Sequence, residues 1–209
     1  TSHKKALFPH STNANHFLYF YIGIIYTQNM VRILELFSGT HSIGKVAKEL
    51  GYEVISLDRD LPATIKADIM TWDYKVYPEG HFDIITASPV CLWWSLLRAS
   101  NIGKKLKAHG GNTVLTKELI QQDIDTYGKP MVDRVREIID YYKPKYYWIE
   151  NPKTGKMKSY ILDLPFYDVD YCQYSDWGYK KSTRFWTNIT EFTPKVCDMK
   201  TCTNVVGTK

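Results

Sequence analysis

The architecture of this chain is set by residues 31–51, VRILELFSGTHSIGKVAKELG. An apolar run over Arg32–Phe37 predicts a buried strand, and the pair Ser38-Gly39 predicts a tight turn behind it. The next residues have the apolar spacing of an amphipathic helix, which Gly51 closes because glycine tolerates a left-handed cap. A second strand is expected at Glu53–Leu57. This order predicts an α/β domain in which helices flank a mostly parallel sheet.

The second predicted strand ends in an acid, Asp58, which lies 19 residues beyond Gly39. In dinucleotide-type βαβ units a glycine lets the ligand approach the backbone, and an acid about 20 residues later accepts hydrogen bonds from a ribose. Only Gly39 and Gly44 remain of the usual glycine pattern, so a ribosyl ligand without phosphates fits at least as well. The alternative is an ordinary βαβ turn with a solvated aspartate.

A thiol follows the next predicted strand, Phe82–Thr86. The chain continues as Ala87-Ser88-Pro89-Val90-Cys91, which brings Cys91 to the edge of the sheet where open α/β folds bind ligands. An exposed thiolate at that edge is a nucleophile. The alternative is that Cys91 is a small buried hydrophobic residue.

A carboxylate follows the fourth predicted strand, Lys145–Ile149, which a helix from about Met131 to Tyr142 precedes. The strand ends in Glu150-Asn151-Pro152, so Glu150 either hydrogen-bonds a heterocyclic base or caps surface structure. A β-rich segment is expected at about Val169–Asn188.

In that last segment, aromatic side chains interleave with Lys180, Lys181 and Arg184. Rings offer stacking surfaces and cations offer phosphate contacts, a mixture that suits nucleic acid. An amphipathic hairpin on the protein surface has the same composition.

In this order, the segments from Arg32 to about Asn188 resemble the DNA cytosine-5 methyltransferase family, especially its compact phage and large-virus members. The resemblance implies a Rossmann-like, S-adenosylmethionine-dependent methyltransferase fold with S-adenosyl-L-methionine as the cofactor. It also implies a DNA substrate whose target cytosine is flipped out of the duplex. The residues that it assigns to the cofactor are Phe37, Ser38, Gly39, Asp58, Asp68 and Pro89.

The same resemblance assigns three catalytic residues. Cys91 matches the nucleophile of the family's Pro-Pro-Cys loop, with Val90 in the place of the second proline. Glu150 matches the glutamate of the Glu-Asn-Val motif, which grips the target cytosine. Arg184 matches the last arginine of the motif that supports the flipped base, where it is expected to hold the neighbouring backbone or Glu150 itself. Lys180 and Ser182 replace the glutamine and first arginine of that motif.

Two other functions fit the sequence. One is a methyltransferase that uses the same cofactor on RNA or a small molecule, with Cys91 in a structural role. The other is a catalytically inactive relative that binds nucleic acid. The basic segment Ser95–Asn112, with a linker at Lys104–Gly111, either closes over DNA or forms a solvated surface.

Composition narrows the class of protein. A chain of 209 residues favours one domain, and a net charge of +5 favours an anionic partner. Four cysteines without a signal peptide indicate a reducing compartment, the cytoplasm of the host cell if the chain is viral. The apolar run Phe17–Tyr26 is too short to span a membrane, and we expect a monomer. Cys197 and Cys202 form a lone Cys-x4-Cys with no further ligand behind it, so no metal is expected.

The chain is expected to have three parts. Residues 1–29 form an N-terminal extension, either a translated leader or a mobile segment. Residues 30–190 form the methyltransferase catalytic domain. Residues 191–209 form a truncated C-terminal segment, which is too short for the separate target-recognition domain that the family usually carries.

Overall fold

The computed structural model describes residues 30–105, 113–175, 179–198, 200 and 202–204. Contacts divide the chain into two units, residues 1–31 and 32–209. All helices and strands of the described residues belong to the second unit. The predicted extension at 1–29 lies outside the described residues, as do residues 106–112 of the predicted basic loop. Within the described ranges, no helix is both long and apolar enough to cross a membrane.

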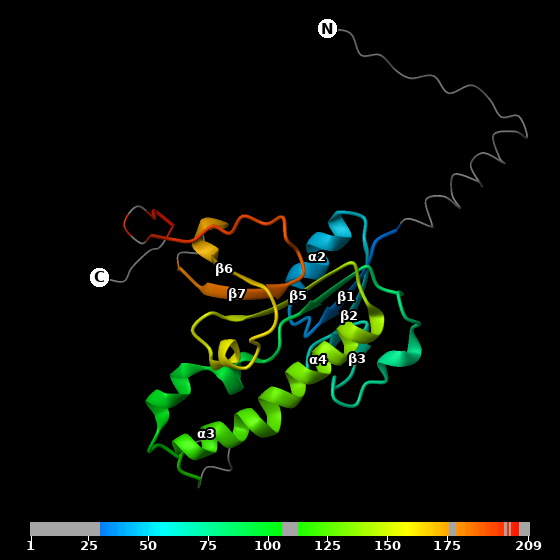
Figure 1. Ribbon diagram of the computed structural model, residues 1–209. Coiled ribbons are helices and arrows are strands. Elements are labelled where there is room, and N and C mark those ends of the chain that lie inside the picture. Colours follow the sequence, from blue (N-terminus) through cyan, green and yellow to red (C-terminus); the bar gives the residue numbers. More distant parts are fainter. Residues whose placement is uncertain (1–29, 106–112, 176–178, 199, 201, 205–209) are drawn as a thin grey trace, which may run out of the picture. The chain divides into compact units, whose positions relative to one another are not determined.

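Seven strands form one sheet in the order β3-β2-β1-β4-β5-β7-β6 (Figure 1). The first five in this order are parallel, whereas β7 is antiparallel to both of its neighbours. The prediction of a mostly parallel sheet is therefore confirmed. The strands are β1 (Arg32–Leu36), β2 (Glu53–Asp58), β3 (Ile65–Lys66), β4 (Ile84–Ala87), β5 (Tyr146–Pro152), β6 (Phe166–Asp170) and β7 (Ser182–Thr187).

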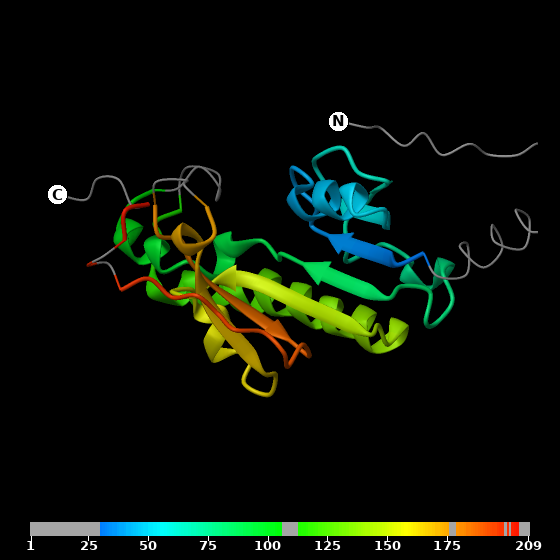
Figure 2. The ribbon, with the colours of Figure 1, turned by 90° about the horizontal axis from the view of Figure 1, so that it is seen from above.

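Helix α2 (Ser42–Glu49) lies on one face of the sheet, and α4 (Lys129–Tyr142) lies on the other (Figure 2). The buried stripe of α4 contains the apolar residues that the sequence predicted for it. The helix begins two residues before the predicted Met131. A π-helical segment, Ile124–Gly128, joins it to α3 (Lys117–Asp123). This continuation was not predicted because a π turn interrupts the 3.6-residue period of the pattern.

Side-chain alternation gives the two faces of the sheet different contents, because successive strand residues point to opposite sides. Leu36, Ala87 and Ile149 are neighbours in register and belong to the hydrophobic core that α4 covers. Glu35 points the other way and accepts hydrogen bonds from the first turn of α2. Polar side chains on the α2 face therefore lie at the end of the sheet where the parallel strands finish.

Candidate functional site

Three connections meet at the carboxyl edge of the sheet. The register Leu36↔Ala87↔Ile149 places the ends of β1, β4 and β5 side by side. The side-chain amide of Asn151 donates to the Pro89 carbonyl at 2.9 Å and ties the loop after β4 to β5. The motifs that follow these three strands therefore lie at the carboxyl edge of the sheet, as expected, because parallel strands end at a common edge.

The turn after β1 is held by a buried carboxylate. Glu35 Oε1 accepts the N–H groups of Ile43 and Gly44 at 3.2 and 3.0 Å, two of the unpaired donors at the start of α2. A Cβ on Gly44 would lie 2.5 Å from the same carboxylate, so glycine permits this close approach. Phe37 has a φ of 57°, a conformation that is rare for a bulky residue outside functional sites.

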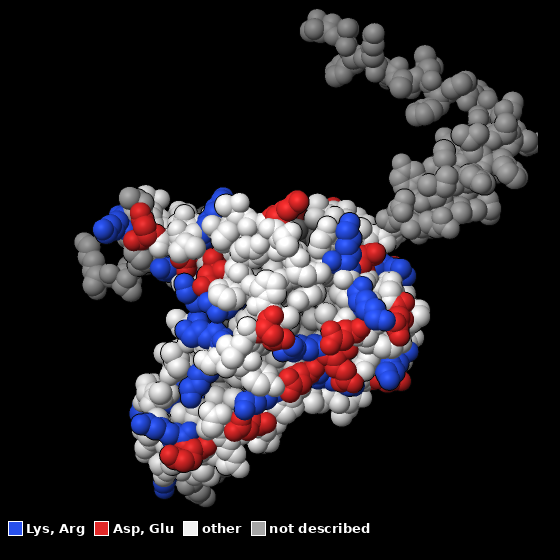
Figure 3. Space-filling model, viewed as in Figure 1, with Lys and Arg blue, Asp and Glu red and all other residues white. Residues whose placement is uncertain are grey.

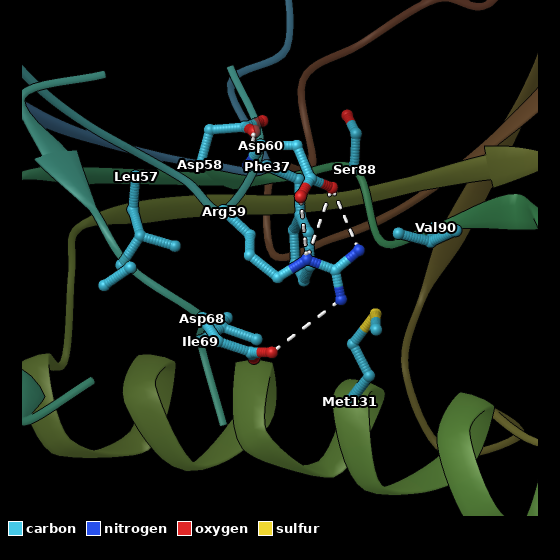
Figure 4. A pocket seen from close by; sticks show the side chains of 11 residues that line it. Phe37, Leu57, Asp58, Arg59, Asp60, Asp68, Ile69, Ser88, Val90 and Met131 are labelled. Carbon is cyan, nitrogen blue, oxygen red and sulfur yellow. Dashed lines mark hydrogen bonds and ion pairs between the residues drawn. The ribbon is translucent and has the colours of Figure 1, made fainter. Parts of the chain in front are cut away.

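A first cavity lies beside β2 and is named the β2 cavity (Figure 4). Its lining includes Phe37, Asp58, Asp68, Ser88, Val90 and Met131. The Arg59 side chain points into this cavity, where it pairs with Asp60 at 2.9 Å and approaches Asp68 to 3.8 Å. The Arg59 side chain is 62% exposed, so a ligand can displace or stack on its guanidinium at little cost.

Asp58 is engaged with the backbone around it. Its carboxylate accepts N–H groups from Gly39, Asp60 and Leu61 at 2.8–2.9 Å. Burial tends to raise the pKa of Asp58, but these three donors outweigh it and hold the pKa below its ordinary value. A carboxylate has about four acceptor sites, so about one remains for a ligand hydroxyl.

A second cavity opens on the α2 face and is named the β5 cavity. Its polar lining includes Ser38, Gly39, Ser88, Glu150, Tyr171 and Lys181. It shares Phe37 and Ser88 with the β2 cavity, so the two cavities adjoin. Among the described residues, Ser38 Oγ and Glu150 Oε1 are buried without a hydrogen-bond partner. Buried polar atoms of this kind are expected to meet a ligand or solvent.

Glu150 is a second, largely buried carboxylate of the β5 cavity besides Glu35, with a side chain 15% exposed. Burial raises its pKa, and both the charge of Lys181 and a hydrogen bond from Ser88 act against that rise. The Lys181 ammonium lies 3.9 Å from Glu150 Oε1, which is too far for a direct hydrogen bond. The folded protein therefore favours the neutral carboxyl more than solution does.

Arg184 is not brought to Glu150. In the β5–β7 ladder Glu150 is opposite Phe185, whereas Arg184 is opposite Asn151, so the side chains of Glu150 and Arg184 point to different faces. Arg184 instead makes a two-pronged pair with Asp168 at 2.7 and 3.0 Å. The expected contact with Glu150 is absent from the structure, and the cation near that carboxylate is Lys181.

Cys91 is exposed at the start of a short 3-10 helix, Cys91–Trp94. It follows Ser88 of both cavities by three positions, a span of at most about 11 Å. The following two tryptophans hold this helix: Trp93 stacks on Tyr127 and the buried Trp94 stacks on Tyr160. The thiol is thus carried on an anchored segment at the same edge as Glu150.

The other three cysteines gather elsewhere in the fold. The sulfur atoms of Cys172, Cys197 and Cys202 all lie within 4.8 Å of one another. The sequence pattern did not indicate that Cys172 lies beside the Cys-x4-Cys pair, because Cys172 precedes Cys197 by 25 residues.

A probable DNA (cytosine-5)-methyltransferase of Frog virus 3 (isolate Goorha) is 46% identical to this chain over 178 residues. The matched region covers 84% of this chain and 79% of the viral protein. This chain belongs to the DNA (cytosine-5)-methyltransferase family. No protein-family model matches it.

Two solved structures are similar to this member of the family in fold. One is a SAM-dependent methyltransferase from Archaeoglobus fulgidus, at 15% identity and a TM-score of 0.40, covering 77% of this chain and 74% of that one. The other is the Dnmt2 methyltransferase of S. pombe, at 13% identity and a TM-score of 0.44, covering 79% and 51%.

Most of the residues that the family resemblance selected thus lie at one edge. Five cofactor candidates line the two cavities, Pro89 is buried beside them, and Cys91 and Glu150 are on neighbouring connections. Sequence reasoning missed Lys181 and Tyr171 as cavity residues. Lys181 directly precedes β7 and has a φ of 30°, so strand alternation does not place its side chain, and only the folded structure brings it near Glu150.

Proposed function

We propose that this protein methylates carbon 5 of cytosine in DNA, with S-adenosyl-L-methionine as methyl donor and a covalent adduct at Cys91. Membership of the family supports the reaction class. The single observation that carries the mechanism is the Glu150 carboxyl, buried with a raised pKa at the edge where Cys91 is exposed. We expect residues 30–190 to form the catalytic domain and the chain to act as a monomer in the reducing cytoplasm of a host cell.

The lining of the two cavities fits the proposed cofactor. In the β2 cavity, Asp58 has about one acceptor site left for a ribose hydroxyl, and Asp68 can accept an adenine amino group once Arg59 moves. The unpartnered Ser38 hydroxyl and the strained backbone at Phe37–Gly39 offer polar atoms to the rest of the molecule. S-adenosylmethionine, when bound, supplies an electrophilic methyl group for carbon 5 of the base.

Cys91 begins the proposed reaction. Carbon 5 of cytosine is a poor nucleophile until the Cys91 thiolate adds to carbon 6 and converts the ring to an enamine. Carbon 5 would then take the methyl group as the bond between that group and the cofactor's sulfonium sulfur breaks, which leaves a thioether. Loss of the carbon-5 proton to solvent would then let the bond between carbon 6 and the Cys91 sulfur break. Cys91 leaves as a thiolate, so the residue is regenerated.

Glu150 polarises the ring during that addition. A protonated Glu150 donates to ring nitrogen 3 and offsets the negative charge that the thiolate brings to the base. Burial keeps this proton available, while Lys181 limits how far the pKa rises. The target atom is inaccessible inside a duplex, so the proposal requires that the cytosine be flipped out to reach Glu150.

The distribution of basic side chains supports a DNA substrate. In Figure 3, Lys and Arg gather along the side that carries the β5–β6 connection, and acidic side chains gather over α4. Lys156 and Lys158 lie in a 3-10 turn, Lys156–Ser159, shortly after β5, and Lys104 and Lys105 follow a second 3-10 helix, Leu96–Asn101, behind the Cys91 helix. Cations there can neutralise phosphates on either side of a flipped base.

The experiment that tests this function is covalent trapping. Duplex DNA that contains 5-fluorocytosine cannot lose its carbon-5 substituent as a proton, so the Cys91 adduct should accumulate in the presence of S-adenosylmethionine. We expect a denaturant-resistant complex with the unmodified protein and none with Cys91→Ser. Leu92→Ala, which truncates the adjacent exposed side chain, is the matched control and should still form the complex.

Two outcomes would contradict the proposal. If Cys91→Ser still traps DNA, another residue is the nucleophile. If the unmodified protein traps no DNA but methylates RNA or a small molecule, it uses S-adenosylmethionine but not the cytosine-5 mechanism.

A further inference from the structure

Three cysteines from separate parts of the chain converge beside the β6–β7 hairpin. Cys172 lies in a 3-10 turn, Tyr171–Gln173, directly after β6, and Cys197 and Cys202 lie in the segment after β7. Their sulfur atoms are within 4.8 Å of one another. Cys172 and Cys197 are buried, and Cys202 is half-buried. None of these thiols has a part in the proposed methyl transfer.

We propose that Cys172, Cys197 and Cys202 bind one zinc ion, which cross-links the C-terminal segment to the end of β6. Three thiolates supply three of the four positions of a tetrahedral site, and solvent completes the fourth. The zinc ion prefers thiolate ligands, and its Zn–S distance of about 2.3 Å corresponds to sulfur separations of about 3.8 Å. The three sulfurs therefore need to approach by about 1 Å or less.

The geometry favours a metal ion over a disulfide. A disulfide would join two of the three sulfurs at about 2 Å and leave the third beside them without a function. A metal uses all three in a single site. The softness of sulfur selects zinc or a similar ion over magnesium or calcium, which prefer oxygen ligands.

Hydrogen bonds around the cluster hold its ligands in place. The Gln173 side-chain amide lies 3.6 Å from Cys202 Sγ and 3.9 Å from Cys172 Sγ, so its N–H groups can donate to thiolates. The Cys197 N–H donates to Asp170 at 2.8 Å, and the Asn204 side chain donates to the Cys172 carbonyl at 2.9 Å. Outer contacts of this kind orient the residues that ligate a metal.

The cross-link would stiffen a segment with little regular structure. Residues 188–198 contain no helix or strand, and few backbone hydrogen bonds tie them to the sheet, among them Asp170 N–H to the Lys195 carbonyl. Tyr171, the neighbour of Cys172, also lines the β5 cavity with Glu150. A bound ion would therefore fix one wall of that cavity while it lies apart from the exposed Cys91.

Metal analysis of the full chain tests this inference without reference to activity. The protein is expressed with added zinc, purified under reducing conditions and freed of loose metal by gel filtration. We expect about one zinc ion per chain, and replacement by cobalt should produce the charge-transfer absorption of several thiolate ligands. Cys202→Ala and Cys172→Ala should each lose most of the ion, whereas Cys91→Ala, the matched control, should keep it.

Cys202 is half-buried, so Cys202→Ala remains a usable test if the buried Cys172 variant fails to fold. The inference is overturned if the unmodified protein carries well under half an equivalent of zinc, or if Cys91→Ala loses as much as Cys202→Ala. A disulfide between any two of the three cysteines in protein isolated without oxidants would also overturn it. None of these results depends on whether the protein methylates DNA.

Discussion

The strands β5, β7 and β6 carry one carboxylate on each face of the sheet, and the two carboxylates have different partners. On the face toward α4, Asp168 receives two hydrogen bonds from Arg184, and Lys153 lies 3.3 Å away. On the face toward α2, Glu150 has one cation at 3.9 Å and one oxygen without a hydrogen-bond partner among the described residues. Burial tends to raise the pKa of both groups. At Glu150 the pKa is raised, whereas at Asp168 the hydrogen bonds and charges of Arg184 and Lys153 outweigh burial and lower it.

The difference separates an acid that holds strands together from an acid that is available for chemistry. A carboxylate paired as closely as Asp168 stays ionised and links β6 to β7. A carboxyl such as Glu150, largely buried with incomplete pairing, has a raised pKa and holds a proton more readily than a free carboxyl does. The resemblance to the family predicted that Arg184 supports the flipped base. In the structure Arg184 pairs with Asp168, so its contacts link β6 to β7.

The largest expected effect is on catalysis at Glu150. Glu150→Gln keeps the shape of the side chain but removes the proton that the base would share, so single-turnover methylation should fall by about 10²–10⁴-fold. Affinity for DNA, measured by titration, should change only a few fold, and thermal stability should not fall because no buried charge loses a partner. Asp168→Asn is the control on the other face and should lower stability more than turnover. Small and equal effects of Glu150→Gln in both assays would remove Glu150 from the mechanism.

The second effect is on stability at Arg184. Arg184→Met keeps an apolar side chain beside Phe166, but it removes the guanidinium that lies over that ring and breaks a pair whose side chains are 13% and 19% exposed. The free energy of unfolding in urea should fall by about 2 kcal/mol, less than for an isolated buried pair because Lys153 still faces Asp168. Arg136→Met, which breaks the more exposed pair with Asp163, should cost under about 1 kcal/mol. If Arg184→Met loses methylation while its stability is unchanged, Arg184 acts in the base pocket and does not mainly stabilise the fold.

The smallest effect is a shift in pH dependence at Lys181. If the reaction needs protonated Glu150, turnover is complete below the pKa of that carboxyl and is lost as the pH rises through it. Lys181 lowers this pKa, so Lys181→Met should move the loss of single-turnover methylation to higher pH, with turnover at low pH changed by about threefold or less. Lys153→Met, on the opposite face, should leave the position of the loss unchanged. A profile that does not move, or moves to lower pH, would mean that Lys181 does not govern Glu150.

Much of the candidate site could be predicted because its motifs are local. Glycine at the turn, an acid at the end of β2 and a thiol behind β4 are each readable within a few residues of a strand. Parallel strands then bring such positions to one edge without any knowledge of long-range packing. The strand β3 and the π-helical segment were missed because two residues give no period and a π turn breaks one.

Contacts between distant segments could not be read in the same way. Asp58 was expected to accept hydrogen bonds from a ribose, but three backbone donors occupy most of its carboxylate. Two of them, Asp60 and Leu61, are local, whereas Gly39 comes from the turn after β1 and reaches Asp58 only through the packing of the two connections. Likewise, Cys172 joins Cys197 and Cys202 only because the segment after β7 returns to the end of β6.

The sequence by itself determined the strands β1, β2, β4 and β5, the helices α2 and α4, the family and the edge at which Cys91 and Glu150 lie. These follow from local patterns, since apolar period and turn residues act over a few positions of the chain. The tertiary structure alone decided which cation meets Glu150. A shift of one residue in the antiparallel register of β7 would place Arg184 instead of Phe185 opposite Glu150, because neighbouring strand residues point to opposite faces, and only packing across the sheet sets that register.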